Sequence, residues 1–144
     1  MQKAIIQFIL AAEGVRMHDL ADLPKLLIVD DEKLIAETLA TIFKGNGYDA
    51  RPAYSAEHAL EIIAEWEPAI AILDVILPAM NGIDLGILLK ASRPSLKVML
   101  MSGQIVAGDL VGDAAKQGHA FEILAKPIEI PELLGVAARL LTAN

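Results

Sequence analysis

Five side chains able to do chemistry stand at or directly after the ends of short apolar stretches in this chain of 144 residues. They are Asp30, Asp31, Asp74, Ser102 and Lys126. The stretches are 25–29, 69–74, 97–101 and 121–125. Short runs that are apolar at nearly every position are typical of strands buried on both faces of a parallel sheet. Because parallel strands end at one edge of their sheet, we expect these side chains to become neighbours.

The expected pocket lies at the carboxyl edge of the sheet, where open α/β sheets bind ligands. With a strand order of 2-1-3-4-5, the first and third strands are adjacent and flank the switch point. Asp30, Asp31 and Asp74 then share one shallow pocket. Ser102 and Lys126 lie on its far side.

Three carboxylates in one pocket repel one another, by about 4 kcal/mol for a pair 4 Å apart at an effective dielectric constant near 20. Either one carboxyl group is protonated or a hard cation binds there. Mg²⁺ fits, because it takes oxygen ligands and is often held by one or two carboxylates plus a phosphate. Such a pocket suits phosphoryl transfer, with Asp74 as nucleophile, Ser102 as hydrogen-bond donor and Lys126 as positive charge.

The elements that must position these residues alternate between strand and helix. Residues 48–53 form a fifth expected strand. We expect it to be weaker and peripheral, because it carries Asp49, Arg51 and Pro52. Helical periodicity follows each strand, over about 34–43, 56–63, 83–92, 109–117 and 133–141. Ser55 is the expected N-cap of the second helix. This alternation predicts an α/β fold, with a five-stranded parallel sheet doubly wound by five helices, as in flavodoxin.

The amino-acid composition argues against several kinds of binding partner and site. Hydrophobic residues make up 55% of the chain and aromatic residues only 4%, which predicts an aliphatic core. Twelve basic and nineteen acidic residues give a net charge of −7, which argues against direct binding to nucleic acid or to an anionic membrane. The chain has no cysteine, which excludes disulfides and Cys-ligated metals and suits a cytoplasmic location.

Four motifs, each at the end of an expected strand, resemble the receiver domains of response regulators in bacterial two-component signalling. These motifs are Leu-Ile-Val-Asp-Asp-Glu at 27–32, Ile-Leu-Asp at 72–74 with Pro-Ala-Met-Asn-Gly at 78–82, Met-Ser-Gly at 101–103, and Lys-Pro at 126–127. Any one of them is a weak signal, but four in this order are specific. The resemblance covers about residues 25–141 and implies the chemotaxis-regulator type of receiver fold.

The resemblance also implies a role for each site residue. Asp74 accepts a phosphoryl group from a phosphohistidine on a sensor histidine kinase or a histidine phosphotransfer protein. Mg²⁺ is bound by Asp31 directly, by Asp30 largely through water, by Asp74, and by the backbone carbonyl of Ile76. Ser102 moves toward the phosphoryl oxygens, and Lys126 pairs with them. The family also implies a cis bond between Lys126 and Pro127, and a switch rather than a turnover enzyme.

Two positions depart from the family pattern. Ile123 stands where the family usually has an aromatic residue that rotates on activation, so Phe121 substitutes for it or that switch is absent. Ile76 stands where many relatives are polar, and we expect it to slow hydrolysis of the acyl phosphate. Ile123 mildly favours an alternative, a phosphorylation-independent interaction module. A phosphatase of the haloacid dehalogenase type would need a second acid at the position of Ile76, which argues against that class.

The two ends of the chain raise separate questions. We expect residues 25–144 to form the receiver domain and residues 1–24 to be an N-terminal extension, either an extra helix or disordered. A signal peptide is disfavoured, because Gln7 interrupts the apolar run 4–12 and Glu13 follows it. A start nearer Met17 is another interpretation. With no DNA-binding module after the last helix, output is expected to pass to an effector protein or to domains outside this sequence, and a homodimer is a possible form.

Overall fold

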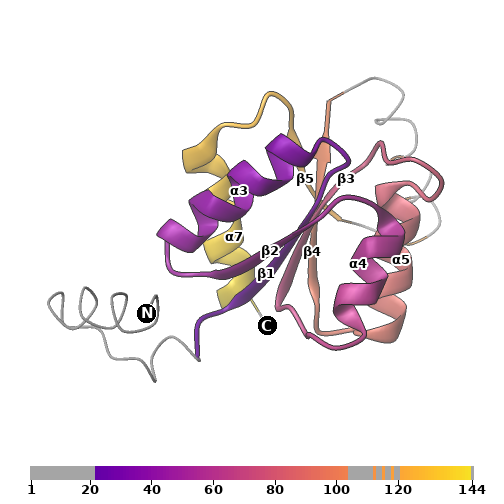
Figure 1. Ribbon diagram of the computed structural model, residues 1–144, viewed down its shortest axis with the longest axis horizontal. Coiled ribbons are helices and arrows are strands. Elements are labelled where there is room, and N and C mark those ends of the chain that lie inside the picture. Colours follow the sequence, from indigo (N-terminus) through magenta and orange to yellow (C-terminus); the bar gives the residue numbers. More distant parts are fainter. Residues whose placement is uncertain (1–21, 104–111, 113–114, 116–117, 119–120, 144) are drawn as a thin grey trace, which may run out of the picture.

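The structure is a computed structural model that describes residues 22–103, 112, 115, 118 and 121–143. Within these residues, strands and helices alternate along most of the chain (Figure 1). The elements are β1 (Lys25–Val29), α3 (Lys33–Gly45), β2 (Asp49–Ala53), α4 (Ala56–Ile63), β3 (Ile70–Asp74), α5 (Gly82–Ser92), β4 (Lys97–Ser102), β5 (Glu122–Ala125) and α7 (Ile130–Thr142). Most boundaries lie within one or two residues of those predicted from the sequence.

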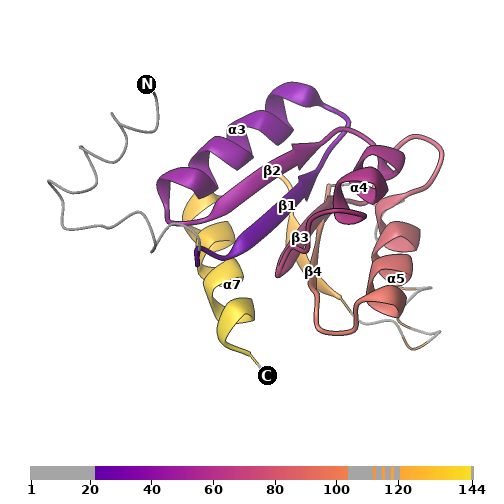
Figure 2. The same ribbon diagram turned by 60° about the horizontal axis from the view of Figure 1, so that its bottom comes forward.

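The five strands form one parallel sheet in the order β2-β1-β3-β4-β5, which confirms the predicted order. Helices α3 and α7 cover one face of the sheet, and α4 and α5 cover the other (Figures 1 and 2). The predicted helix at 109–117 lies almost wholly outside the described residues, so a count of five helices is not confirmed. The N-terminal extension also lies outside them, except for residues 22–24.

The core consists of two apolar layers, one on each face of the sheet. Every residue of β3 is buried, as its unbroken apolar sequence predicted. Alternate residues of the central strands enter opposite layers, so Leu27 faces α4 and α5 whereas Leu26 and Ile28 face α3 and α7. The core is mostly aliphatic, and it fixes β1 and β3 side by side at the edge that carries the acids.

Local signals fix where helix α4 begins. Ser55 has extended backbone dihedrals, and its hydroxyl oxygen accepts a hydrogen bond from the amide of His58 at 3.0 Å, which confirms the predicted N-cap. The amide of Tyr54 in turn donates to Nδ1 of His58 at 3.2 Å. The turn between β2 and α4 is therefore held by the side chains of the N-cap Ser55 and of His58 in the first turn of α4.

Replacing Ser55 with alanine is expected to lower the free energy of unfolding by about 1 kcal/mol, because one amide of the first helical turn loses its acceptor. Chemical denaturation followed by circular dichroism measures the change. Thr41→Ala is the matched control, since the Thr41 hydroxyl only donates to the Glu37 carbonyl on the exposed side of α3. Its effect should stay within about 0.5 kcal/mol, and an equal loss in both variants would contradict the capping role.

The loop between β3 and α5 has an irregular backbone, as Pro78 and the Asn81-Gly82 pair predicted. Ala79 has a φ of 65°, in the left-handed region that non-glycine residues rarely occupy. The Asn81 side chain accepts a hydrogen bond from the Asp84 amide at 2.8 Å and so caps α5. This loop carries the chain from Asp74 into α5 within eight residues.

The helices of the described residues also bear on membrane insertion. Each of them falls short of the length and apolar character that a membrane crossing requires.

Candidate functional site

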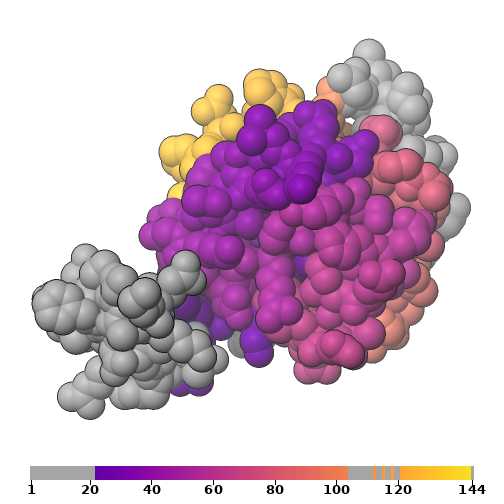
Figure 3. All heavy atoms as spheres, viewed as in Figure 1, coloured from indigo at the N-terminus to yellow at the C-terminus, as the bar shows by residue number. Residues whose placement is uncertain are grey.

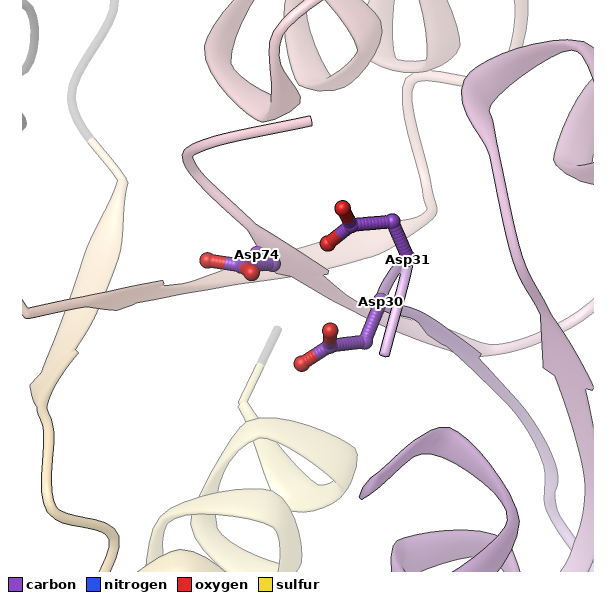
Figure 4. A group of neighbouring side chains, drawn as sticks. All are labelled: Asp30, Asp31 and Asp74. Atoms are coloured by element: carbon purple, nitrogen blue, oxygen red, sulfur yellow. The ribbon is translucent and has the colours of Figure 1, made fainter. Parts of the chain in front are cut away.

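The predicted site residues gather at the carboxyl edge of the sheet. Figure 4 shows the carboxylates of Asp30, Asp31 and Asp74 directed toward a common space, the first two from the end of β1 and the third from the end of β3. Strands β1 and β3 are paired, with Val29 opposite Leu73. The strand order that the sequence predicted is therefore what brings these acids together.

Asp74 is held firmly at the end of β3. Its backbone pairs with Met101, and the next amide, that of Val75, donates to the Met101 carbonyl at 3.1 Å. One carboxylate oxygen, Oδ1, accepts a weak hydrogen bond from the Ile76 amide at 3.4 Å. The other, Oδ2, lies 3.2 Å from Nζ of Lys126. The residue is only 7% exposed, so its accessible oxygens face the pocket and little else.

Asp30 is fully buried. Its Oδ1 accepts a hydrogen bond from the Glu32 amide at 2.9 Å, and its own amide donates to the Ala53 carbonyl at 3.1 Å. Its Oδ2 lies 3.8 Å from Nζ of Lys126 and has no hydrogen-bond partner among the described residues. A buried carboxylate oxygen left without a donor is costly, which indicates that a further ligand belongs beside it.

The three carboxylates fit a divalent cation. One oxygen from each of Asp30, Asp31 and Asp74 can be chosen so that all three lie within 4.8 Å of one another. Opposite oxygens around Mg²⁺ lie about 4.2 Å apart, twice its usual bond length of about 2.1 Å. Small carboxylate movements would therefore complete such a site. The all-oxygen donor set and the unpaired oxygen of Asp30 both match the preferences of this ion.

Burial shifts the titration of the two enclosed acids. It raises the pKa of Asp30 above its ordinary value of 3.8, and the charge of Asp74 adds to the rise, while the Glu32 amide and Lys126 oppose it. Burial likewise raises the pKa of Asp74, chiefly against the charge and hydrogen bond of Lys126. Without a cation, ionising both Asp30 and Asp74 is therefore unfavourable in this pocket.

Stability in the presence of EDTA is expected to fall as pH rises above about 4, because these two acids bind protons more tightly in the folded state than in the unfolded state. Their contribution to stability is fully present below the unfolded pKa of 3.8, where both acids are neutral. It is lost as pH rises through the raised folded pKa values. Asp30→Asn cannot ionise, so its stability relative to the wild type should increase over this range. Denaturant titrations from pH 4 to pH 8 measure this difference, and a flat difference would contradict the raised pKa.

Lys126 and Ser102 complete the edge. Ser102 ends β4 opposite Ala125, and its carbonyl accepts a hydrogen bond from the Lys126 amide at 3.0 Å. The Lys126–Pro127 bond is cis, as predicted. The structure thus brings Lys126 into contact with two of the acids and places Ser102 at the same edge. The roles predicted for the Ser102 hydroxyl and the Ile76 carbonyl stay predictions.

Two glycines contribute in ways that the motifs alone did not indicate. A Cβ atom on Gly82 would overlap the carbonyl oxygen of Asp74, so α5 can begin against the end of β3 only because this residue has no side chain. A Cβ atom on Gly103 would lie 3.1 and 3.2 Å from two carbons of the Lys126 side chain. The available signal was their position as the last residue of two of the site motifs, where a glycine often marks a close approach.

The two departures from the family pattern take definite positions. Ile123 is 42% exposed on β5. Phe121 is partly buried, and its ring lies 3.4 Å from where a Cβ atom of Gly86 on α5 would stand. The aromatic ring is therefore packed against α5 in this conformation. Whether it takes over a switching role stays a prediction.

Comparisons with known proteins agree with the observed fold. The family model for the response regulator receiver domain matches residues 26–138. The chain is 34% identical over 119 residues to the DNA-binding transcriptional regulator NtrC of Azospirillum brasilense, covering 83% of this chain and 24% of NtrC. It is 31% identical over 117 residues to the DNA-binding response regulator MtrA of Mycobacterium tuberculosis, covering 81% of this chain and 50% of MtrA. The chain thus spans about a quarter to half the length of these relatives.

Solved structures agree with the sequence comparisons. A CheY-like response regulator receiver domain from Methanospirillum hungatei superposes with a TM-score of 0.72 at 26% identity, covering 83% of this chain and 94% of that one. The structural similarity therefore extends over most of the chain.

Proposed function

Because this chain belongs to the response regulator receiver domain family of two-component signalling, we propose that Asp74 accepts a phosphoryl group with the help of Mg²⁺. The donor is a phosphohistidine on a sensor histidine kinase or a histidine phosphotransfer protein. The resulting conformational change passes to a downstream effector protein. The observation that carries this proposal is the contact of the buried Asp74 carboxylate with Lys126 on one side and two further acids on the other.

The chemistry follows from the surroundings of Asp74. An ionised carboxylate oxygen attacks phosphorus, a new O–P bond forms, the P–N bond of phosphohistidine breaks, and the imidazole nitrogen leaves with the electron pair. Lys126 lowers the pKa of Asp74 against the effect of burial and so favours the ionised nucleophile. The same ammonium can then pair with an oxygen of the transferred group, while the Ser102 hydroxyl donates to another.

The metal-binding residues would be Asp31, Asp30 largely through water, Asp74, and the Ile76 carbonyl. When bound, Mg²⁺ neutralises negative charge on the phosphoryl oxygens. The hydrogen bond from the Glu32 amide fixes the Asp30 carboxylate, and its unpaired oxygen lies 3.8 Å from Nζ of Lys126. These residues act once per signalling event, so we propose a switch rather than a turnover enzyme, acting in the cytoplasm, with homodimerisation as a possible consequence of phosphorylation.

Incubation with acetyl phosphate and Mg²⁺, followed by intact mass spectrometry, tests the proposal. We expect the wild type to gain one phosphoryl group, and we expect no gain with EDTA or in Asp74→Asn. A gain that persists in Asp74→Asn would move the acceptor to another residue. No gain in the wild type would favour the second candidate function, a phosphorylation-independent interaction module, for which the exposed Ile123 at the usual aromatic position is the supporting observation.

Ile76→Asn is expected to shorten the lifetime of the acyl phosphate several-fold. The Ile76 side chain stands two residues beyond Asp74 and is about half exposed, so its apolar surface shields the acyl phosphate from attacking water. A polar amide could instead hold a water molecule there. The decay of the phosphorylated mass after removal of acetyl phosphate measures the lifetime, with Leu88→Asn on the outer surface of α5 as control. An unchanged lifetime in Ile76→Asn would contradict this role.

A further inference from the structure

The outer surface of α3 carries an apolar groove beside the site. Leu34 is 78% exposed, the highest value among the large hydrophobic residues that are exposed in the described part of the chain. A shallow groove of about 310 Å³ begins at this residue. Its described lining residues, which we call the α3 groove, are Leu34, Glu37, Thr38, Thr41 and Ile42. Their spacing places them along one outward stripe of the helix. Figure 3 shows α3, in indigo to violet, on the outside of the molecule.

The same chain contains an apolar segment that precedes the residues matched by the receiver-domain family model. Eight of the nine residues from 4 to 12 are Ala, Ile, Leu or Phe, the exception being Gln7. Such a run is costly to leave in water, at about 25 cal/mol for each Å² of apolar surface. A surface segment this apolar normally marks an interaction.

The point where the described chain begins favours an intramolecular contact. The Pro24 carbonyl accepts a hydrogen bond of 2.9 Å from the amide of Asp49, at the start of β2. The amide of the adjoining residue, Tyr48, donates a hydrogen bond to the carbonyl of Phe43 in the last turns of α3. The chain therefore enters the domain beside the carboxyl end of α3, which is the end of the groove formed by Thr41 and Ile42.

The connecting length is sufficient. The nine residues from 13 to 21 can span up to about 30 Å. Helix α3, with 13 residues, is about 20 Å long. The apolar segment can thus reach every part of the groove, and a connection this short gives an effective concentration in the millimolar range.

We propose that residues 4–12 pack against the α3 groove of their own chain and cover Leu34. Leu34 lies three residues beyond Asp31, so the covered surface borders the acidic pocket. This contact does not rest on the proposed function.

Paramagnetic relaxation in the full chain tests the contact. The chain has no cysteine, so Thr41→Cys accepts a single spin label within the groove, and Ser92→Cys on α5 is the matched control on the other face of the sheet. We expect the label at position 41 to reduce the amide signals of residues 4–12 several-fold, and the label at position 92 to leave them unchanged. Adding Leu34→Lys should abolish the reduction, and because Leu34 is exposed the fold should tolerate it.

Three results would overturn the proposal: no reduction from position 41, equal reduction from both positions, or reduction retained in Leu34→Lys. Mixing spin-labelled chains with ¹⁵N-labelled chains that carry no spin label tests for a second copy as the occupant. Reduction in that mixture equal to the reduction within one chain would also overturn it. No phosphoryl group enters this experiment, so its outcome is independent of whether Asp74 is phosphorylated.

Discussion

Gly82→Ala is expected to destabilise the protein by about 3 kcal/mol, at the upper end of the usual cost of overpacking. A Cβ atom at this position would overlap the carbonyl oxygen of Asp74 and lie 2.8 Å from its carbonyl carbon. Both are backbone atoms of a buried strand and cannot move aside alone. The first turn of α5 must therefore shift, which strains the hydrogen bond of 2.9 Å from the Gly82 amide to the Val75 carbonyl.

The effect should reach the site as well as the fold, because the clash falls on the backbone of Asp74. We expect slower phosphoryl uptake from acetyl phosphate in whatever fraction of Gly82→Ala remains folded. Gly135→Ala is the matched control: a Cβ atom there meets no other atom within 4 Å, and the residue lies in α7. That variant should be more stable by about 0.5–1 kcal/mol. Equal stability of the two variants in denaturant titrations would refute the steric argument.

Lys126→Met has the second large expected effect, a loss of stability on the order of 3 kcal/mol at pH 7 in EDTA. The ammonium lies 3.2 Å from Asp74 and 3.8 Å from Asp30, and both acids are buried. Removing one partner of a buried ion pair leaves an uncompensated charge, which costs about 3–5 kcal/mol. The lower end of this energy range applies here, because the Lys126 side chain is 29% exposed to solvent.

The loss in Lys126→Met should depend on pH and on Mg²⁺. It should shrink at low pH, where the carboxyl groups are protonated, and it should shrink with Mg²⁺, because a bound cation replaces the missing charge. Lys33→Met is the matched control, since Lys33 and Glu37 form an exposed pair at 3.9 Å. Its effect should stay below about 1 kcal/mol. A loss in Lys126→Met that is the same at every pH and Mg²⁺ concentration would show that packing alone is responsible.

The sequence was most informative where residue type alone dictates structure. Unbroken apolar runs such as Ile70–Leu73 can only be satisfied by burial on both faces, so the parallel sheet and its helices followed from them. With the strand order 2-1-3-4-5, Asp30, Asp31 and Asp74 were then expected to meet at the switch point between β1 and β3. The contact between Lys126 and two acids is a direct consequence of strands ending at one edge.

The rest depended on distances that sequence patterns do not contain. Gly82 reads as part of an ordinary Asn-Gly turn, and only the approach of α5 to the backbone of Asp74 explains why no side chain fits there. From sequence alone, Asp30-Asp31-Glu32 could also be read as the cap of α3, a role compatible with metal binding. In the structure, Glu32 occupies the N-cap position without a side-chain hydrogen bond, and Asp30 instead accepts from the Glu32 amide. Likewise, the exposure of Leu34 and Ile123 depends on which elements pack against them.

The central claim is that Asp74 itself becomes the acyl phosphate. Treating the wild type with acetyl phosphate and Mg²⁺, then with sodium borohydride, converts a phosphorylated aspartate to homoserine, which peptide mass spectrometry locates. We predict homoserine at position 74 and unchanged aspartate at positions 30 and 31. Homoserine at either of those two positions, or its absence from the whole peptide map of a phosphorylated sample, would contradict the account.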